Sequence, residues 1–215
     1  MNYPDLVRRV ANRYATCSRF SRYFVPAKLR LDPVHKTVLD LAAEFTFGAV
    51  VDIGCGRAQL GLLLLEAHAA DSVIGIDRDA NVLRDARRAA GNMALILERA
   101  DAGTYSIPDC DTVLLIDVLY QLPTDVQGAL LGRAAGSARS AVVIRNFAPD
   151  RGWRTMVTRC SEAILRGLRL KHSPIVNPRP TDWFVTILEA SGFTVARRPC
   201  SRGTPFAGML LVATR

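Results

Sequence analysis

The alternation of short apolar segments with helix-like segments over residues 49–147 constrains the fold of this chain most. The apolar segments predict five strands, at 49–54, 72–77, 93–101, 111–120 and 140–147. The segments between them predict helices at 57–69, 79–90 and 123–136. Strands that alternate with helices form a parallel sheet covered by helices on both faces. The sequence therefore predicts a doubly wound α/β fold, with any ligand at the carboxyl ends of the strands.

The flanking segments have a different pattern. Residues 4–22 have apolar positions at steps of three and four and predict one amphipathic helix, after which Pro26 and Pro33 interrupt the chain. A second helix is expected from Pro33 to about Phe45, with Asp32 as its N-cap. Beyond the last of the five strands, the expected elements are an arginine-studded helix at 152–170, a proline-rich loop at 172–180, a helix at 181–192 and strands at 193–200 and 205–214.

The net charge of +8 is unevenly distributed over the 215 residues. Residues 1–30 carry seven basic and one acidic side chain, residues 31–132 seven basic and fifteen acidic, and residues 133–202 thirteen basic and four acidic. One interpretation is drift towards arginine in a GC-rich genome. The other is that the two basic segments meet over one site that receives an anionic partner.

Composition narrows the class of protein. With 49% apolar and 22% charged residues, the chain can bury a sizeable core. Its five cysteines are too far apart for a CxxC pair, a metal-binding motif or a dense disulfide framework. The first residues lack the apolar stretch of a secretory signal, and no window approaches the roughly 18 apolar residues of a membrane span. We therefore expect a soluble cytoplasmic protein.

The stretch VVDIGCGRAQLG (50–61) joins the first predicted strand to its helix. Gly54 and Gly56 allow a tight turn and a close approach of the backbone to a ligand, beside the free N–H groups of a helix start. The spacing differs from the dinucleotide fingerprint, since Gln59 takes the place of its third glycine, and it is not that of a phosphate-binding loop.

An acidic residue falls at or near the carboxyl end of each of four predicted strands. These residues are Asp52, Asp77, Asp101 and Asp117. A carboxylate after the second strand suits two ribose hydroxyls, and one after the third suits an adenine amino group. Asp77 also fits a helix cap and Asp101 a turn, so each has a structural alternative, but four acids at one edge of one sheet favour a nucleoside-like ligand.

This arrangement resembles the class I S-adenosylmethionine-dependent methyltransferases. The matching segments are VVDIGCG, IGIDRD, ERAD and DTVLLIDVLYQLP. The resemblance implies a mostly parallel seven-stranded sheet with an antiparallel last strand, and S-adenosylmethionine as cofactor. It also implies cofactor-binding roles for Asp52, Gly54, Cys55, Gly56, Asp77, Arg78, Asp101, Ala102 and Asp117. Cys55 is expected to be a packing residue of the loop and not a nucleophile.

A narrower resemblance covers nearly the whole chain. KLRLDPV (28–34), GWR (152–154) and SRGTPFAGMLLVA (201–213) look like segments of small bacterial methyltransferases found with aryl-polyene and xanthomonadin-type pigment genes. The resemblance implies an aromatic or polyene acyl acceptor, free or bound to acyl carrier protein. The chain departs from that pattern in the RAQLG segment (57–61) and in its more basic N-terminus. Its expected domains are an N-terminal helical lid (1–32) and a methyltransferase domain (33–215) with an arginine-rich helical insert (151–180).

Residues that reach the strand ends are the candidates for the acceptor side. An anionic acceptor suits the basic residues Lys28, Arg30, Arg145, Arg154 and Arg179, because guanidinium groups bind carboxylates and phosphates bidentately. Tyr120 and Asn146 are the candidate catalytic residues, since they follow the fourth strand and end the fifth. Tyr14, His35 and His172 are further possible bases with plausible structural roles. No metal ligand is expected.

Two other functions stay open. The charge of +8 suits an RNA-directed methyltransferase, although the chain lacks an aromatic-laced basic stripe and nucleic acid is therefore disfavoured. The second open function is non-catalytic. The chain would then be a cofactor-binding interaction protein, or a peripheral membrane protein that uses the arginine-rich segment 4–24, which also contains Tyr and Phe. The oligomeric state and the acceptor atom do not follow from the sequence.

Overall fold

The computed structural model describes residues 2–147, 177–200 and 208–215, and its centre is a seven-stranded sheet in the order β3-β2-β1-β4-β5-β7-β6. Strands β1 to β5 are parallel, and β7 is antiparallel to both β5 and β6. This confirms the predicted fold class, including the antiparallel last strand. The strands are β1 (Ala49–Ile53), β2 (Ser72–Asp77), β3 (Leu95–Arg99), β4 (Cys110–Ile116), β5 (Ala138–Phe147), β6 (Thr194–Pro199) and β7 (Gly208–Thr214).

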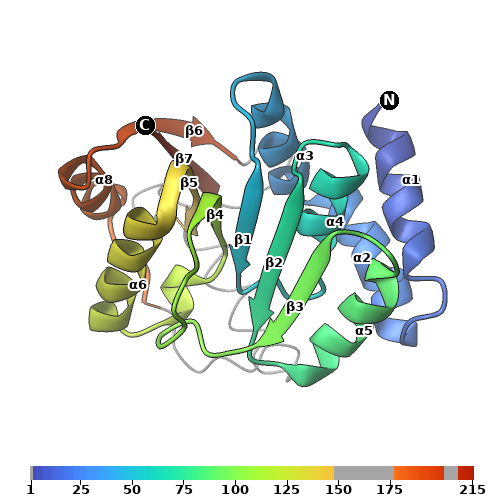
Figure 1. Cartoon of the computed structure of the whole chain (residues 1–215). Helices are drawn as coiled ribbons and strands as arrows, with labels where there is room; N and C mark the ends of the chain where they lie inside the picture. The colour runs from blue at the N-terminus through green and yellow to red at the C-terminus, as the bar shows by residue number, and fades with distance from the viewer. Residues whose placement is uncertain (1, 148–176, 201–207) are drawn as a thin grey trace, which may run out of the picture.

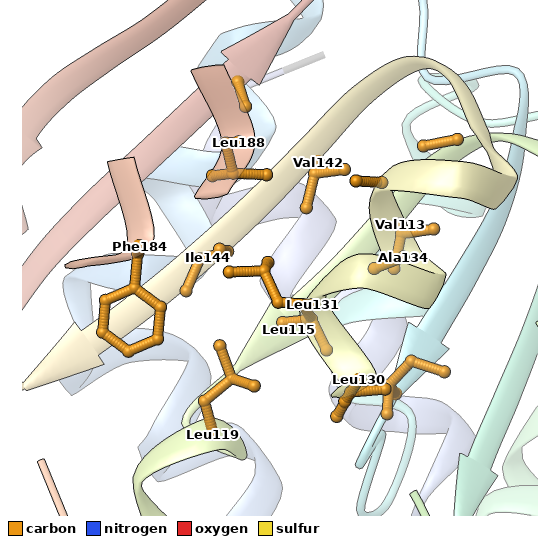
Figure 2. Close-up of a cluster of buried hydrophobic side chains, with 14 of the residues drawn as sticks. Val113, Leu115, Leu119, Leu130, Leu131, Ala134, Val142, Ile144, Phe184 and Leu188 are labelled. Carbon is orange, nitrogen blue, oxygen red and sulfur yellow. The ribbon is translucent and has the colours of Figure 1, made fainter. Parts of the chain in front are cut away.

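Helices cover both faces of the sheet (Figure 1). The helical elements are α1 (Tyr3–Arg13), α2 (Arg19–Leu31), α3 (Pro33–Asp40), η1 (Leu41–Ala43), α4 (Gln59–Glu66), α5 (Ala80–Ala90), η2 (Leu119–Gln121), α6 (Thr124–Ser137) and α8 (Thr181–Ala190). One buried cluster joins α6 and α8 to the sheet, and Figure 2 shows Leu131 and Phe184 facing Leu115 and Ile144 within it. A second cluster joins α3 and α4 to the opposite face. Among the described residues, no helix is long and apolar enough to cross a membrane.

The N-terminal segment corrects one prediction. The single helix expected over residues 4–22 is wrong, because the chain breaks after α1 and begins α2 at Arg19. Ser18 caps α2 by accepting a hydrogen bond from the Ser21 amide. Pro26 lies inside α2 and does not end it, since buried Val25 and Leu29 hold the helix against the core on either side of the proline. Packing of an amphipathic face thus outweighs the loss of one backbone hydrogen bond.

Helix α1 is part of the core of the fold. Its apolar residues, Val7 and Val10 among them, share a buried cluster with Leu62 and Leu63 of α4. Arg13 of this helix donates a 2.6 Å hydrogen bond from Nε to the carboxylate of buried Glu66. The segment predicted as a lid therefore has a firmly packed first helix, and both the end of α1, through Tyr14, and α2, through Ser21, contact Arg57 of the glycine loop.

Strand β4 is shorter than predicted, and its end sets up the site. It stops at Ile116 and not at Tyr120, because Asp117 adopts a left-handed backbone conformation with φ of 60°. The chain then turns into the short helix η2, Leu119–Gln121. A left-handed conformation at a residue other than glycine is uncommon and is held by its surroundings. The helix expected at 152–170, the GWR segment and the first part of the SRGTPFAGMLLVA segment, residues 201–207, lie outside the described residues.

Candidate functional site

The glycine loop after β1 has the tight geometry that its sequence predicts. Gly54 and Gly56 have φ values of 76° and 56°. The backbone N–H groups of Gly54 and Cys55 both donate to the Ile76 carbonyl, at 2.9 Å each. A Cβ atom on Gly54 would lie 2.9 Å from Val118 Cγ2, whereas one on Gly56 would meet nothing within 4 Å. Gly54 is therefore closed in by protein, and Gly56 faces open space.

We expect Gly54→Ala and Gly56→Ala to separate folding from ligand binding. The left-handed backbone alone costs about 1–2 kcal/mol for an alanine at either position. Gly54→Ala adds a clash with Val118, so urea unfolding should show a loss of more than about 2 kcal/mol. Gly56→Ala should lose less stability than Gly54→Ala and mainly weaken ligand binding. Equal losses of stability in the two variants would contradict this reading of the loop.

Asp77 connects the end of β2 to the glycine loop. Its Oδ2 accepts a 3.0 Å hydrogen bond from the Gly56 amide, and its Oδ1 accepts a 2.9 Å bond from the Asp79 amide. Each carboxylate oxygen keeps a free lone pair, because an ionised carboxylate has about four acceptor sites. The Asp77 carboxylate can therefore position the loop and accept hydrogen bonds from a ligand at the same time.

An open pocket with about 620 Å³ of empty space, part of it continuous with solvent, lies at this edge of the sheet. Carboxylates from the ends of three elements and apolar side chains from between them make up its wall. Its lining residues are Gly54, Ile76, Asp77, Arg78, Ala100, Asp101, Ala102, Asp117, Val118, Gln121 and Leu122. The pocket thus offers hydrogen-bond acceptors for hydroxyl and amino groups beside apolar surface for a flat ring.

Asp52 lies at the end of β1 and is only 3% exposed. Burial and then the negative charge of Asp77 raise the pKa of Asp52 to about 7, and the charge of Lys28 offsets part of this rise. Near neutral pH the Asp52 carboxyl therefore exchanges readily between its neutral and its ionised form. A cationic ligand group nearby would favour the ionised form.

Arg145 joins the pocket to the N-terminal segment. Its Nη1 lies 2.8 Å from Asp32 Oδ2 and 3.1 Å from Asp117 Oδ2, and the side chain is almost fully buried. Burial opposes ionisation of Asp32, but the charges of Arg145 and Lys28 outweigh it and hold the pKa of Asp32 below its usual value. The guanidinium group thereby fixes the carboxylate of Asp117, which lines the pocket.

Breaking this ion cluster should be costly. We expect Arg145→Gln to destabilise the protein by about 3–5 kcal/mol, because it leaves the carboxylates of Asp32 and Asp117 close together without a counter-charge. Urea unfolding measures the loss. Arg139→Gln is the matched control, since its pair with Asp111 is exposed and worth at most about 1 kcal/mol. Similar losses in both variants would rule out a special role for the buried cluster.

The predicted cofactor residues fall into two groups. Gly54, Asp77, Arg78, Asp101, Ala102 and Asp117 line the pocket. The other three, Asp52, Cys55 and Gly56, belong to the end of β1 and the loop but are not among the lining residues. Cys55 is buried against Leu83 and Ala86 of α5, and burial raises the pKa of its thiol. Its environment is thus that of a packing residue.

The predicted catalytic residues are buried next to the ends of β4 and β5. Tyr120 is 6% exposed on η2, and Asn146 is 1% exposed near the end of β5. The Asn146 side chain donates a 3.1 Å bond to the Arg179 carbonyl, and its Oδ1 has no partner among the residues the structure describes. Neither residue is among those that line the pocket.

The other base candidates have structural surroundings. Tyr14 is fully buried and its hydroxyl donates to the backbone carbonyl of Arg57 in the glycine loop. His35 is buried beside the Asp32 carbonyl, and burial together with the charge of Lys28 lowers its pKa to about 4, so it is neutral near pH 7. His172 lies outside the described residues.

The basic residues predicted to hold an anionic acceptor differ in their availability. Arg145 pairs through Nη1 with the carboxylates of Asp32 and Asp117, so the structure gives its charge a partner within the protein. Lys28 is half-buried with its ammonium 5.9 Å from the Phe24 ring centre, and Arg30 is exposed. The Arg179 guanidinium lies over the Trp183 ring. Arg154 lies outside the described residues.

Sequence reasoning missed several contributors. Val118, Gln121 and Leu122 line the pocket only because β4 ends early and η2 brings them back to the strand ends. Arg57 lies 4.8 Å from the Phe20 ring centre and donates a 2.6 Å bond to Ser21 Oγ, so α2 supports the glycine loop. No local signal in the sequence indicates these contacts. The predicted cap is confirmed: Asp32 Oδ1 accepts a hydrogen bond from the Val34 amide at the start of α3, while Oδ2 pairs with Arg145.

Comparisons with known proteins agree with this arrangement. Residues 50–140 match the family described as "Methyltransferase domain". Trans-aconitate 2-methyltransferase of Rhizobium etli is 32% identical over 71 residues, which are 33% of this chain and 27% of the relative. The match thus spans only about a quarter of that relative's length.

Solved structures match over nearly the whole chain. Magnesium protoporphyrin IX methyltransferase from Synechocystis PCC 6803 with bound SAH is 19% identical with a TM-score of 0.68, and the match covers 97% of this chain and 93% of that one. The N-methyltransferase NodS from Bradyrhizobium japonicum is 17% identical with a TM-score of 0.62, covering 99% and 97%. The chain therefore has the Rossmann-like methyltransferase fold, and its residues 50–140 match the methyltransferase-domain family.

Proposed function

We propose that the chain is an S-adenosylmethionine-dependent methyltransferase that acts on a small acceptor. The observation that carries the proposal is one pocket, at the carboxyl edge of the sheet, lined together by Gly54, Asp77, Asp101 and Asp117. The match of residues 50–140 to the methyltransferase-domain family supports it. So does the bound SAH of a structure with the same fold.

The residues of the pocket fit S-adenosylmethionine. Asp77 would accept hydrogen bonds from the two ribose hydroxyls while it holds the Gly56 amide. Asp101 and Ala102 would hold the adenine edge, with Ile76 and Leu122 as apolar wall. The backbone at Gly56 leaves open space beside the loop, where a side chain would compete with the ligand. Asp117 and the nearby Asp52 provide negative charge for the ammonium group of the methionine part.

S-adenosylmethionine supplies an electrophilic methyl group on a sulfonium, and the thioether that leaves is neutral. The chain's task is therefore positioning and electrostatic selection, more than acid–base chemistry. Asp52, Asp77 and Asp117 make this edge of the sheet acidic. Such an edge favours the cationic cofactor over its neutral demethylated product, which promotes exchange after transfer.

The acceptor is a small molecule that is anionic or bound to an acyl carrier, with an aromatic or acyl group. The basic flanking segments support an anionic acceptor, and the resemblance to methyltransferases found with pigment genes supports an aromatic or acyl one. The names of trans-aconitate 2-methyltransferase and magnesium protoporphyrin IX methyltransferase, which contain small-molecule substrates, support a small acceptor. Tyr120 and Asn146, next to the ends of β4 and β5, are the residues proposed for the acceptor side.

Two measurements test the proposal. Calorimetric titration of the full chain with S-adenosylhomocysteine should show binding in the micromolar range, and no binding at millimolar concentration would overturn the assignment of the cofactor. Transfer of a labelled methyl group should then be compared for aromatic acids, free or carrier-bound, and for RNA. Transfer to RNA alone would keep the cofactor assignment and overturn the small acceptor.

A further inference from the structure

Helix α2 exposes a continuous apolar stripe. Phe20, Tyr23, Ala27 and Leu31 follow one another at steps of three, four and four, which places them on one side of the helix. The exposed fractions of Phe20, Tyr23 and Leu31 are 48%, 64% and 74%, and these are three of the four exposed large hydrophobic residues in the described part of the chain. The opposite side of α2 is buried in the core. The helix is therefore fully packed against the protein, and the exposed stripe is a second apolar face.

Exposed basic side chains flank this stripe along one side, and no acidic residue of α2 interrupts it. Arg19, Arg22 and Arg30 are exposed on α2, and the segment Arg19–Leu31 contains no Asp or Glu. None of the three arginines forms an ion pair with a described residue. The Arg22 guanidinium lies 5.4 Å from the centre of the Tyr23 ring. The exposed face of α2 thus combines an apolar stripe with a cationic edge along one side.

We propose that this face of α2 docks the protein on an anionic lipid surface. Phe20, Tyr23 and Leu31 enter the interfacial layer, and Arg19, Arg22 and Arg30 contact lipid phosphates. An exposed apolar stripe with aromatic residues and basic flanks is the pattern of helices that lie in the membrane interface. The stripe is on the convex surface of one helix, and a flat, deformable lipid surface accepts such a shape without the preformed pockets that protein partners use.

The structure also changes which residues would dock. The sequence places a possible membrane contact in residues 4–24, but the apolar face of α1 is buried against α4. Docking therefore belongs to Arg19–Leu31, which is α2 alone. Since Arg57 of the glycine loop contacts both the Phe20 and Phe24 rings, the docked face borders the loop. An acceptor dissolved in or attached to a membrane would then be delivered close to the site.

Vesicle binding of the full chain tests the proposal. Sedimentation with vesicles of phosphatidylcholine, with and without one third phosphatidylserine, should show at least about tenfold tighter binding to the anionic vesicles. The triple variant Arg19→Gln, Arg22→Gln, Arg30→Gln should bind them about a hundredfold more weakly, at about fivefold for each lost charge. The double variant Tyr23→Ser, Leu31→Ser should lose at least about tenfold, since it removes apolar contact with the lipid.

Matched controls lie on other elements, α5 and β3. Arg84→Gln, Arg87→Gln and Arg88→Gln remove the same charge from exposed positions of α5, and Ile96→Ser removes a side chain that is 60% exposed on β3. These controls should keep binding to within about fivefold. Equal loss in the control and α2 variants would overturn the proposal, because it would show only a general effect of charge. Absence of binding to anionic vesicles, or binding to an acidic protein in their place, would overturn it as well.

S-adenosylhomocysteine affinity, measured for every variant, separates this proposal from the proposed function. The substituted residues do not line the cofactor pocket, so the affinity should stay unchanged while vesicle binding falls. A variant that loses both vesicle binding and S-adenosylhomocysteine affinity has lost its fold. The other α2 variant then decides the test. Intact vesicle binding by a chain that binds no cofactor would leave docking in place and overturn only the enzymatic assignment.

Discussion

Asp77→Asn is expected to weaken binding of S-adenosylmethionine and S-adenosylhomocysteine by at least about a hundredfold. The carboxylate would accept charge-assisted hydrogen bonds from two hydroxyls, each worth about 1.5–3 kcal/mol. An amide offers only one acceptor oxygen, so it cannot hold the Gly56 amide, the Asp79 amide and both hydroxyls at once. Calorimetric titration gives both affinities.

Asp79→Asn is the matched control for this substitution. Asp79 is two residues away and caps α5 by accepting a 2.8 Å bond from the Asn81 amide, a role that asparagine fills equally well. Its cofactor affinity should stay within about threefold of the original. If Asp77→Asn kept its affinity as well, the ribose would have to bind elsewhere. That result would contradict the assignment of this pocket as the cofactor site.

Asp52→Asn is expected to stabilise the protein and weaken cofactor binding in the same step. At pH 8 the folded chain keeps an ionised carboxylate in a buried site, at a cost that the asparagine variant does not have. With a pKa of about 7 against an ordinary 3.8, the gain in unfolding free energy is about 2–4 kcal/mol. Cofactor affinity should fall by about tenfold to a hundredfold, because the charge near the ammonium group is lost.

The raised pKa of Asp52 determines how stability and cofactor affinity change with pH. A carboxyl whose pKa is raised by folding binds its proton more tightly in the folded chain, so its contribution to stability is complete at low pH. That contribution declines as the pH rises from about 4 to 7 and stays lost above pH 7. Cofactor affinity should move the other way and increase with pH up to about 7, because binding needs the ionised form.

Urea unfolding and calorimetry from pH 5 to 8 check both trends. The informative quantity is the difference between the original chain and Asp52→Asn, since other groups titrate identically in both. That difference should grow as the pH rises and level off above the pKa of about 7. A constant difference across the range, or an affinity that ignores pH, would show that Asp52 is ionised throughout.

The positions of the four acidic residues were predictable because they follow from periodicity alone. Parallel strands end at one edge, so Asp77 and Asp101 had to lie close together once residues 49–147 were assigned as strands and helices. The structure places both in the wall of one pocket with Asp117. The alternation of elements thus carries most of the information about the cofactor side of the site.

Contacts between distant segments were not predictable from local pattern. Arg145 and Asp32 are 113 residues apart, and nothing in either neighbourhood shows that they pair. The steps of three and four along residues 4–22 continue through Tyr14 and Cys17, so periodicity alone could not reveal the break between α1 and α2. The left-handed conformation of Asp117 likewise depends on its surroundings, since Asp adopts it more readily than most residues but usually does not.

We expect the hydrogen bond from Tyr14 to the Arg57 carbonyl to couple the glycine loop to local unfolding of the N-terminal helices. Tyr14 and Arg57 are 43 residues apart, and Arg13 and Glu66 are 53 apart, so transient detachment of α1 and α2 would remove two supports of the glycine loop and of α4. Cofactor binding should then favour the attached state. In hydrogen-exchange measurements, amides of residues 3–31 should gain protection when S-adenosylhomocysteine binds, although no residue of this segment lines the pocket. Unchanged exchange there would show that the loop keeps its shape on its own.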